Sequence, residues 1–409
     1  MKRLGHQWGG ATGGILAYTH LSHDLVTGLL VALIPLIREA LGLNYFQSGL
    51  LVSAYTITAG IAHIPMGWIG DHANRRAMAA LGLGGVSLAA IAIGLGPGYY
   101  PMLAIAVILG VLAGAYHPAA VSLLSGYIEP ARRGKALALH MLGGSIGLAL
   151  GPVLGGLIAD NLGWRFAFIL LTIPALVAVP LVLGRLGYMD AAGRGQAGGA
   201  SGSDETTVGQ RLMLIGRVLR PVAIIVALVF LMQFIGGSFM AFIGLYLTDK
   251  HGVVPSLAVM WVGVVRGGGM AGSLLGGWLS DRWGRRKVIF LVILATGPIL
   301  YLIARLPYGA VFAVVLVVFG LVSYMKQPAM HALLMDESPP QLRATIFGLY
   351  FGFSMEGVSV IQPLAGYFMD KFGIVSVFDV MALVAVGLSL AGLVLVKGFS
   401  LRRDGLDRR

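Results

Sequence analysis

Residues 67–76 read GWIGDHANRR, and residues 277–286 read GWLSDRWGRR. Glycine, tryptophan, aspartate and both arginines recur at the same places, 210 residues apart in a chain of 409 residues. Each copy lies between two long apolar runs, so a short charged turn joins one apolar segment to the next. A charged decapeptide of this kind, repeated half a chain later, predicts a duplicated membrane protein with one copy in each half.

The composition supports a membrane protein. Hydrophobic residues make up 57% of the chain and charged residues only 11%, whereas an ordinary soluble domain has about 25% charged residues. Cysteine is absent, which excludes disulfides, thiolate chemistry and cysteine-based metal sites. The N-terminus leads into an apolar run without a small-residue cleavage site, so we expect a retained first span and not a signal peptide.

The hydropathy pattern predicts twelve spans, each long enough to cross about 30 Å of hydrocarbon. They are 14–37, 45–70, 77–96, 100–128, 135–159, 165–187, 220–247, 255–280, 287–305, 309–335, 343–369 and 374–397. The one long connection is rich in glycine and serine and is predicted to be a flexible linker. The predicted organisation is a six-helix bundle at 1–187, a cytoplasmic linker at 188–218, and a second six-helix bundle with a short tail at 219–409.

The orientation follows from the distribution of the 29 lysines and arginines. If the N-terminus is cytoplasmic, five fall on the outer side (Arg38, Arg165, Lys250, Arg305, Lys371) and two lie within spans (Arg266, Lys326). The rest fall on the cytoplasmic side, as the positive-inside rule requires. The net charge of +12 therefore indicates topology and not a nucleic-acid partner. Two halves with the same orientation predict parallel repeats, with both termini and both decapeptides in the cytoplasm.

The second decapeptide fits the pattern Gly-x-x-x-Asp-Arg-x-Gly-Arg-Arg, and with it the chain resembles a major facilitator superfamily transporter. The resemblance implies an all-α membrane protein of two pseudo-symmetric six-helix bundles around a central cavity, which works by alternating access. The first copy departs from the pattern at His72 and Asn74. Asparagine tolerates left-handed backbone better than other non-glycine residues, so we expect Asn74 to keep the turn.

In that family the charged loops hold the cytoplasmic face closed, so the resemblance implies a cytoplasmic gate. We expect Asp71 to engage helix N-terminal dipoles or the basic pair Arg132 and Arg133. The alternative is that these charges only anchor the topology. The candidate gate residues are Gly67, Asp71, Arg75, Arg76, Glu129, Arg133, Gly277, Asp281, Arg282, Arg285, Arg286, Glu337 and Arg343.

The fifth predicted span carries a glycine-rich motif, because residues 147–156 read GLALGPVLGG. Glycines give a flat face for close helix contact, and a proline inside a helix removes a backbone hydrogen bond and kinks it. The motif resembles a signature of exporters, chiefly proton-linked antiporters; the alternative is a generic packing face. The motif residues are Gly147, Gly151, Pro152, Gly155 and Gly156.

The first predicted span holds three ionisable residues, His20, His23 and Asp24. Asp24 lies about 15 Å along the span, near mid-membrane, and His20 lies one turn earlier on the same face. Ionisable residues inside spans are costly and indicate function. We expect this group to bind and release the coupling proton; the alternative is a structural hydrogen-bonded pair.

Other polar residues fall inside the remaining spans and are candidates for the lining of the substrate cavity. Two buried cations and one carboxylate in the second half favour pairing of Glu356 with one of the cations. The other cation is then free to attract an anionic substrate or to offset Asp24 across the cavity. The candidate cavity residues are His117, Gln233, Arg266, Lys326 and Glu356.

Three short strings, at residues 21–24, 32–36 and 116–118, are similar to the fosmidomycin-resistance group of drug exporters. The resemblance implies a secondary active transporter that exports a small organic compound of the drug or antibiotic type, anions included, in exchange for protons. Two transport alternatives stay open: a proton-coupled importer of an organic anion, and a lipid or lysolipid transporter.

Methionines in the seventh and tenth predicted spans favour metal transport only weakly, because their spacing gives no clean pair on one helix face. A receptor or scaffold that transports nothing is the remaining alternative. No nucleotide-binding signature follows a predicted strand, so we expect no enzyme activity, no cofactor and no resident metal. The expected partners are a small-molecule substrate, protons and the lipid bilayer, around a monomer in the inner membrane.

Overall fold

The computed structural model describes residues 8–72, 74–96, 98–186, 223–338, 346, 350 and 357–406. Within these ranges the chain is helical, and ten helices are long and apolar enough to cross a membrane. The predicted all-α membrane fold is therefore confirmed. The predicted linker and the first part of the predicted eleventh span lie outside the described residues.

The first half of the chain contains nine helices within the described ranges, and their ends follow proline and glycine. The predicted first span divides into α2 (Gly10–Thr27), α3 (Leu29–Ala32) and α4 (Ile34–Leu41). Pro35 is in the first turn of α4, where its missing N–H costs nothing. The next elements are α5 (Tyr45–His72), α6 (Arg75–Leu95), α7 (Tyr99–Tyr127), α8 (Pro130–Leu162), α9 (Trp164–Leu170) and α10 (Ile173–Arg185).

The second half repeats this order. Its elements are α12 (Ala223–His251), α13 (Pro255–Trp283), α14 (Arg285–Arg305), α15 (Ala310–Glu337), η3 (Gly357–Val360), α17 (Ile361–Phe372) and α18 (Ile374–Leu406). Most ends fall close to those predicted, because the apolar runs stop where the turns begin. The exception is α18, which continues to Leu406 and so passes the predicted end at residue 397.

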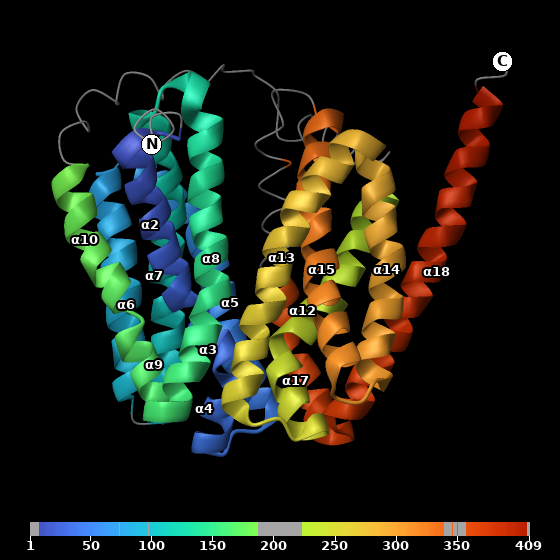
Figure 1. Ribbon diagram of the computed structural model, residues 1–409, viewed down its shortest axis with the longest axis horizontal. Helices are drawn as coiled ribbons and strands as arrows, with labels where there is room; N and C mark the ends of the chain where they lie inside the picture. Colours follow the sequence, from blue (N-terminus) through green and yellow to red (C-terminus); the bar gives the residue numbers. More distant parts are fainter. Residues whose placement is uncertain are drawn as a thin grey trace.

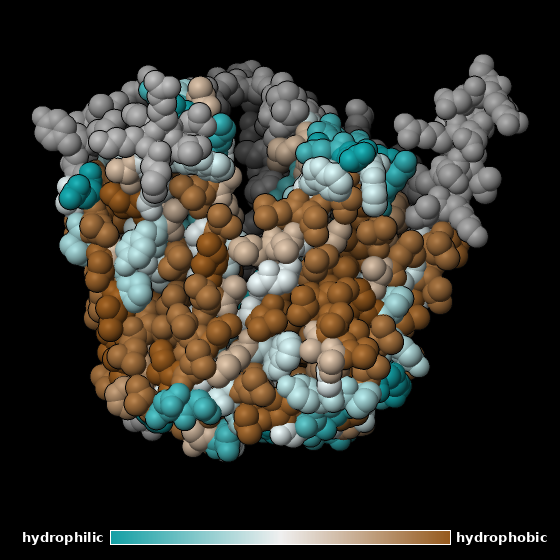
Figure 2. Space-filling model, viewed as in Figure 1, coloured by the Kyte–Doolittle hydropathy of each residue, from teal (hydrophilic) through white to brown (hydrophobic). Residues whose placement is uncertain are grey.

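The helices gather into two groups, α2 to α10 on one side and α12 to α18 on the other (Figure 1). We call the end of the molecule that carries the α5–α6 and α13–α14 turns the motif face, and the opposite end the far face. On the far face, glycines with positive φ end several helices, among them Gly42 and Gly373. Apolar side chains cover the middle of the visible surface and polar ones collect at its two ends (Figure 2), as a bilayer requires.

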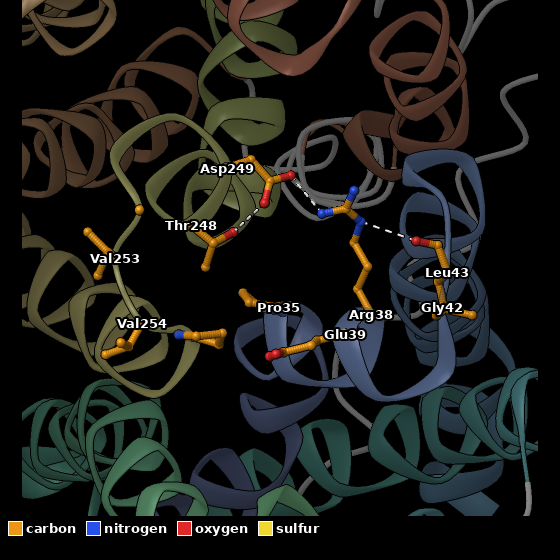
Figure 3. Close-up of a pocket in the computed structure, with 11 residues that line it drawn as sticks. Pro35, Arg38, Glu39, Gly42, Leu43, Thr248, Asp249, Val253 and Val254 are labelled. Carbon is orange, nitrogen blue, oxygen red and sulfur yellow. Dashed lines mark hydrogen bonds and ion pairs between the residues drawn. The ribbon is translucent and has the colours of Figure 1, made fainter.

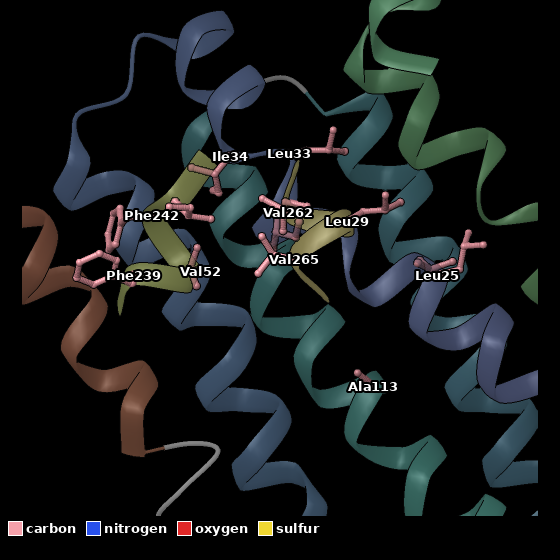
Figure 4. Packing of buried hydrophobic residues seen from close by; sticks show 14 of the residues in the cluster. Leu25, Leu29, Leu33, Ile34, Val52, Ala113, Phe239, Phe242, Val262 and Val265 are labelled. Atoms are coloured by element: carbon pink, nitrogen blue, oxygen red, sulfur yellow. The ribbon is translucent and has the colours of Figure 1, made fainter. Parts of the chain in front are cut away.

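One continuous cluster of buried apolar side chains joins the two halves. Figure 4 shows Leu29 of α3 near Val262 and Val265 of α13, and Val52 of α5 near Phe242 of α12. Inside a bilayer such contacts are stabilised by close van der Waals packing and not by removal of the side chains from water. The halves therefore meet through packed side chains and not through the chain connection alone.

The contacts between the halves lie toward the far face. Gly156 of α8 lies so close to Ser256 and Met260 of α13 that a Cβ atom would collide with them. Gly49 of α5 approaches Gln362 of α17 in the same way. Toward the motif face the two groups of helices separate (Figures 1 and 2). Among the described residues, the two halves are thus in contact at the far face and apart at the motif face.

Candidate functional site

Asp24 of α2 lies at the centre of a polar cluster inside the first half. Only 6% of this residue is exposed. Its Oδ1 is 2.8 Å from Nδ1 of His23, and its Oδ2 is 3.2 Å from Nε2 of His20. Nε2 of His117, on α7, is 4.0 Å from Oδ1. The structure therefore brings His117, a predicted cavity residue, to the three residues predicted for proton coupling.

His20 is held in place by α8. Its Nδ1 is 2.8 Å from the backbone oxygen of His140, and its ring stacks on the His140 ring with 4.2 Å between centroids. A Cβ atom at Gly144 would collide with the His20 imidazole. The glycine-rich face of α8 thus provides a slot that a larger residue would fill, and the slot fixes the imidazole against Asp24.

The hydrogen bonds of His20 determine how many protons the cluster holds. Both partners of its ring nitrogens, a backbone carbonyl and a carboxylate, are acceptors. Nδ1 therefore donates to the His140 carbonyl. The contact between Nε2 and Asp24 needs one further proton, carried either by His20 or by the carboxyl group. Without that proton, a lone pair would face a carboxylate. The spacing therefore fits a His20–Asp24 pair that shares one proton.

Further aromatic side chains connect this pair to α5. The His117 ring lies 5.2 Å from the His20 ring and 5.6 Å from the His63 ring of α5, measured between centroids. The His117 side chain is 35% exposed, in contrast to its buried neighbours. Tyr116 is buried and shares a 2.7 Å hydrogen bond with Thr19 of α2. His117 is therefore the member of the cluster that is most open to solvent.

The predicted exporter motif lies on α8 between this cluster and the second half. Cβ atoms at Gly147 and Gly151 would collide with the backbone of α2 at Leu21 and Leu25. Gly156, one turn further, faces α13 of the other half. Pro152 is buried inside the helix, and Gly155 faces the Leu29 side chain. This helix thus contacts both the element that carries Asp24 and the opposing half.

Three predicted cavity residues of the second half are described, Gln233, Arg266 and Lys326, and none of them is in the Asp24 cluster. Nη1 of Arg266 on α13 donates to the backbone oxygen of Gly28, 3.3 Å away, at the break between α2 and α3. Lys326 of α15 is only 8% exposed, and no carboxylate lies within ion-pair distance of it in the part of the chain that is described. Gln233 is half-buried on α12. Glu356 lies outside the described residues, so its predicted pairing stays a prediction.

The second charged repeat makes contacts within its own half. Arg285 forms ion pairs with Asp281 and with Asp336, the latter at 3.4 Å, and Arg286 pairs with Glu337 at 2.7 Å. These contacts attach the α13–α14 turn to the end of α15. Arg282 stacks over the Trp278 ring at 5.4 Å. Arg343 lies outside the described residues, and Gly277 is in α13 near Pro328.

The first charged repeat is built differently, and the expectation for Asn74 was wrong. Asn74 has φ −70° and ψ 103°, which is extended backbone, whereas Gly284 in the second repeat has φ +97°. The Asn74 side chain accepts a 3.0 Å hydrogen bond from the Ala77 amide and caps α6. This cap satisfies a helix-end donor without left-handed backbone.

The other predicted gate residues of the first half also make local contacts. Arg132 pairs with Glu129 at 3.5 Å, and Arg133 donates to the Ile128 backbone oxygen at 2.9 Å. Arg75 and Arg76 are half-buried at the start of α6. Gly67 and Asp71 fall in the last turns of α5, but their side chains are not described. The contacts given for Arg132 and Arg133 thus stay within the first half.

A set of polar contacts across the far face escaped sequence reasoning, and we call it the far-face latch. Arg38 pairs with Asp249 at 2.6 Å, and the Tyr45 hydroxyl also donates to Asp249. Asp370 of α17 accepts the amides of Tyr45 and Phe46, at 2.8 and 2.9 Å, and so caps α5 of the other half. Arg38 and Asp249 also line a cavity of about 610 Å³ between the halves (Figure 3).

The far-face latch includes one more contact, between α8 and α13. Oδ1 of Asp160 at the end of α8 is 2.8 Å from the Ser256 hydroxyl at the start of α13. Asp160 and Asp370 are separated by 210 residues in the sequence, as are Phe46 and Ser256. Each half therefore places one carboxylate on the first turn of a helix in the other half. The same offset as that of the decapeptides could have revealed this pair.

The chain is similar to two drug-resistance proteins over most of its length. The chain is 24% identical over 378 residues to the fosmidomycin resistance protein of Escherichia coli (strain K12), which covers 90% of this chain and 89% of that protein. It is 26% identical over 374 residues to the multidrug resistance protein MdtG of Serratia proteamaculans (strain 568), covering 88% of this chain and 87% of that one.

A solved structure shows the same fold. A bacterial homologue of the human lysosomal transporter Spinster, in an inward-facing and occupied conformation, superimposes with a TM-score of 0.73 at 15% identity. The superposition covers 92% of this chain and 96% of that chain. The sequence model of the family Major Facilitator Superfamily matches residues 16–361. The chain therefore belongs to the Major Facilitator Superfamily: it is a multi-pass membrane transporter of small molecules and not an enzyme.

Proposed function

We propose that this transporter exports small organic compounds of the antibiotic or drug type in exchange for protons, and that the His20–Asp24 pair carries the coupling proton. The observation that carries the proposal is the pairing of one buried carboxylate with an imidazole whose other nitrogen already donates to a carbonyl. With one shared proton, the imidazole and the carboxylate attract each other. When that proton leaves, a nitrogen lone pair faces the carboxylate and the two groups repel each other.

Access to the pair is expected from the motif face. His117 contacts Asp24 and is more exposed than the other residues of the cluster, and the His63 ring follows it on α5. A proton that reaches His117 from water needs only a small rotation of the imidazole to pass to Asp24. We therefore assign His117 and His63 to the proton path.

The direction of transport rests on two supports. The relatives described above are named for resistance to fosmidomycin and to multiple drugs, which suits export of a toxic compound. The intact glycine motif of α8 packs against α2 on one side and α13 on the other. A change at Asp24 on α2 is therefore transmitted along α8 to the contact between the halves.

The distribution of lysine and arginine supports the inference that the motif face and both termini are cytoplasmic in an inner-membrane protein. With that orientation the described conformation is open to the cytoplasm. The far-face latch is then the outer gate, and the charged repeats form the inner gate in the opposite conformation. Units 1–187 and 219–409, joined by the linker 188–218, move against each other between these states.

The substrate class is supported by the cations of the second half. Lys326 is buried in α15 and has no carboxylate partner in the part of the chain that is described. A buried charge without a partner is costly, so an anionic group on the substrate would stabilise it. Small organic acids, including phosphonate and carboxylate antibiotics, are the compounds that fit this site.

The test uses cells and inside-out membrane vesicles that contain the wild-type protein or the Asp24→Asn variant. A panel of toxic compounds that includes fosmidomycin identifies a substrate by increased resistance, and vesicles then report its flux against an imposed pH gradient. We expect substrate to move opposite to the proton, and Asp24→Asn to abolish this movement while Glu39→Gln, an exposed carboxylate at the far face, has no effect.

Flux of the substrate in the same direction as the proton would instead establish the importer. Full gradient-driven export by Asp24→Asn would remove Asp24 from the coupling mechanism. Equal expression and a single symmetric peak in size-exclusion chromatography show that both variants fold.

A further inference from the structure

Three potential metal ligands meet at the Asp24 cluster. The Nε2 atoms of His20 and His117 and a carboxylate oxygen of Asp24 all lie within 4.8 Å of one another. They come from two helices, α2 and α7, that pack side by side. No other trio of histidine and carboxylate ligands at this spacing occurs among residues whose positions are described. Two imidazoles and one carboxylate are a ligand set that suits zinc and its neighbours among the transition metals.

The surroundings orient these ligands as a metal requires. The backbone oxygen of His140 holds Nδ1 of His20, which directs Nε2 toward Asp24. His23 donates from Nδ1 to Oδ1 of Asp24 and fixes the carboxylate. Metal-binding histidines commonly give their second nitrogen to a carbonyl or carboxylate in this way, and such outer partners set the ligand direction. The outer shell of a metal site is therefore already in place.

The separations suit a small ion. In a tetrahedral zinc site the ligand atoms lie about 3.3 Å apart, since each bond is about 2.0–2.1 Å long. The contact from His20 to Asp24 is 3.2 Å, and that from His117 to Asp24 is 4.0 Å. His117 is the residue that must move inward, and it is also the most exposed of the three and lies directly before Pro118, which interrupts the hydrogen bonding of α7.

We propose that His20, Asp24 and His117 bind one divalent metal ion of the zinc class, and that the bound ion blocks proton-driven transport. Zinc takes the Nε2 lone pair of His20, so the metal and the shared proton exclude each other at this site. Three protein ligands leave a fourth position open to water or to an anion. One ion enters and the displaced proton goes to solvent, with no change of oxidation state.

The metal site uses the residues of the proposed proton site, but binding to purified protein needs neither a substrate nor a direction of transport. The test is isothermal titration of zinc chloride into full-length protein in detergent, after removal of any affinity tag. We expect one zinc ion per chain. His117→Gln and Asp24→Asn should each lower the affinity by more than about 100-fold, since loss of an outer partner alone costs about 10–100-fold.

His23→Gln is expected to lower the zinc affinity by only about 10–100-fold. His251→Gln, which changes a histidine at the far face, should bind zinc as the wild type does. As a second measurement, cobalt(II) in place of zinc should give the intense visible bands of a tetrahedral site, absent in His117→Gln. No saturable binding, or binding unchanged in His117→Gln and Asp24→Asn, overturns the metal site and leaves the proton-coupling test untouched. Zinc binding with undiminished gradient-driven flux overturns the block.

Discussion

The two halves agree at the far face and differ at mid-membrane. At the far face Asp160 and Asp370 hold equivalent places, and each binds the first turn of a helix in the other half. At mid-membrane, Tyr116-His117-Pro118 of α7 corresponds to Lys326-Gln327-Pro328 of α15. The first segment contacts Asp24, which also pairs with two histidines of α2. The second segment contains the buried cation Lys326.

This difference separates two tasks. Contacts that both halves share close the molecule, because a symmetric pair of caps can open and close on both sides together. In the proposed mechanism, residues that only one half has do the chemistry: the His20–Asp24 pair of the first half shares a proton, and Lys326 of the second half offers a positive charge to the substrate. In that mechanism the duplicated fold supplies the gates, and divergence between the copies supplies coupling and recognition.

The largest effect on recognition is expected from Lys326→Met. The substrate concentration for half-maximal transport should rise about 10- to 100-fold, because a hydrogen bond to a charged group contributes about 1.5–3 kcal/mol and each 1.4 kcal/mol is a factor of ten. Initial rates in proteoliposomes measure it, with Lys371→Met, an exposed cation at the far face, as the control. Unchanged affinity together with lost proton coupling would reverse the roles of the two halves.

A smaller effect is expected from the latch. Asp370→Asn and Asp160→Asn should each favour opening of the far face about twofold to fivefold, since half-exposed polar pairs contribute about 0.5–1 kcal/mol. The chain has no cysteine, so a single Val253→Cys in the pocket wall can report opening through its labelling rate with an impermeant maleimide.

The same measurement tests the symmetry of the latch. Similar acceleration in the two variants, with no change in Glu39→Gln, supports a two-sided gate. Acceleration in only one of them would show that the halves are held by one contact and that the second carboxylate has another role.

The charged repeats are tested through the stability of the fold, with no effect on recognition or coupling expected. Gly284 has left-handed backbone, so Gly284→Ala strains the turn by about 1–2 kcal/mol, while Asn74→Ala removes a helix cap worth about 1 kcal/mol. Thermal unfolding in detergent should show a lower melting temperature for both variants and little change for Gly126→Ala, where a Cβ atom meets open space. A stable Asn74→Ala variant would contradict the capping role.

Much of the fold could be predicted from the sequence, because hydropathy and helix length determine where a chain can cross a bilayer. The His20–Asp24 pair was also within reach, since four residues along a helix give one face. The approach of His117 was not, because it depends on how closely α7 packs against α2, which glycines and proline set in three dimensions. The prediction of left-handed backbone at Asn74 was wrong because the side chain caps α6 by accepting a hydrogen bond from the Ala77 amide.

The latch shows a different kind of limit. Arg38 and Asp249 are separated by most of the first half and the linker, and nothing local in either segment indicates their partner. Asp160 and Asp370, by contrast, share a place in the two repeats, so the repeat itself contained the signal.

In the proposed mechanism the His20–Asp24 pair carries the coupling proton while the second half recognises the substrate. The most direct measurement compares two assays on the same proteoliposomes with Asp24→Asn: accumulation driven by a pH gradient, and counterflow of labelled against unlabelled substrate at equal pH. We expect accumulation at the level of protein-free vesicles and counterflow close to that of the wild type. Gradient-driven accumulation that persists in Asp24→Asn would contradict it.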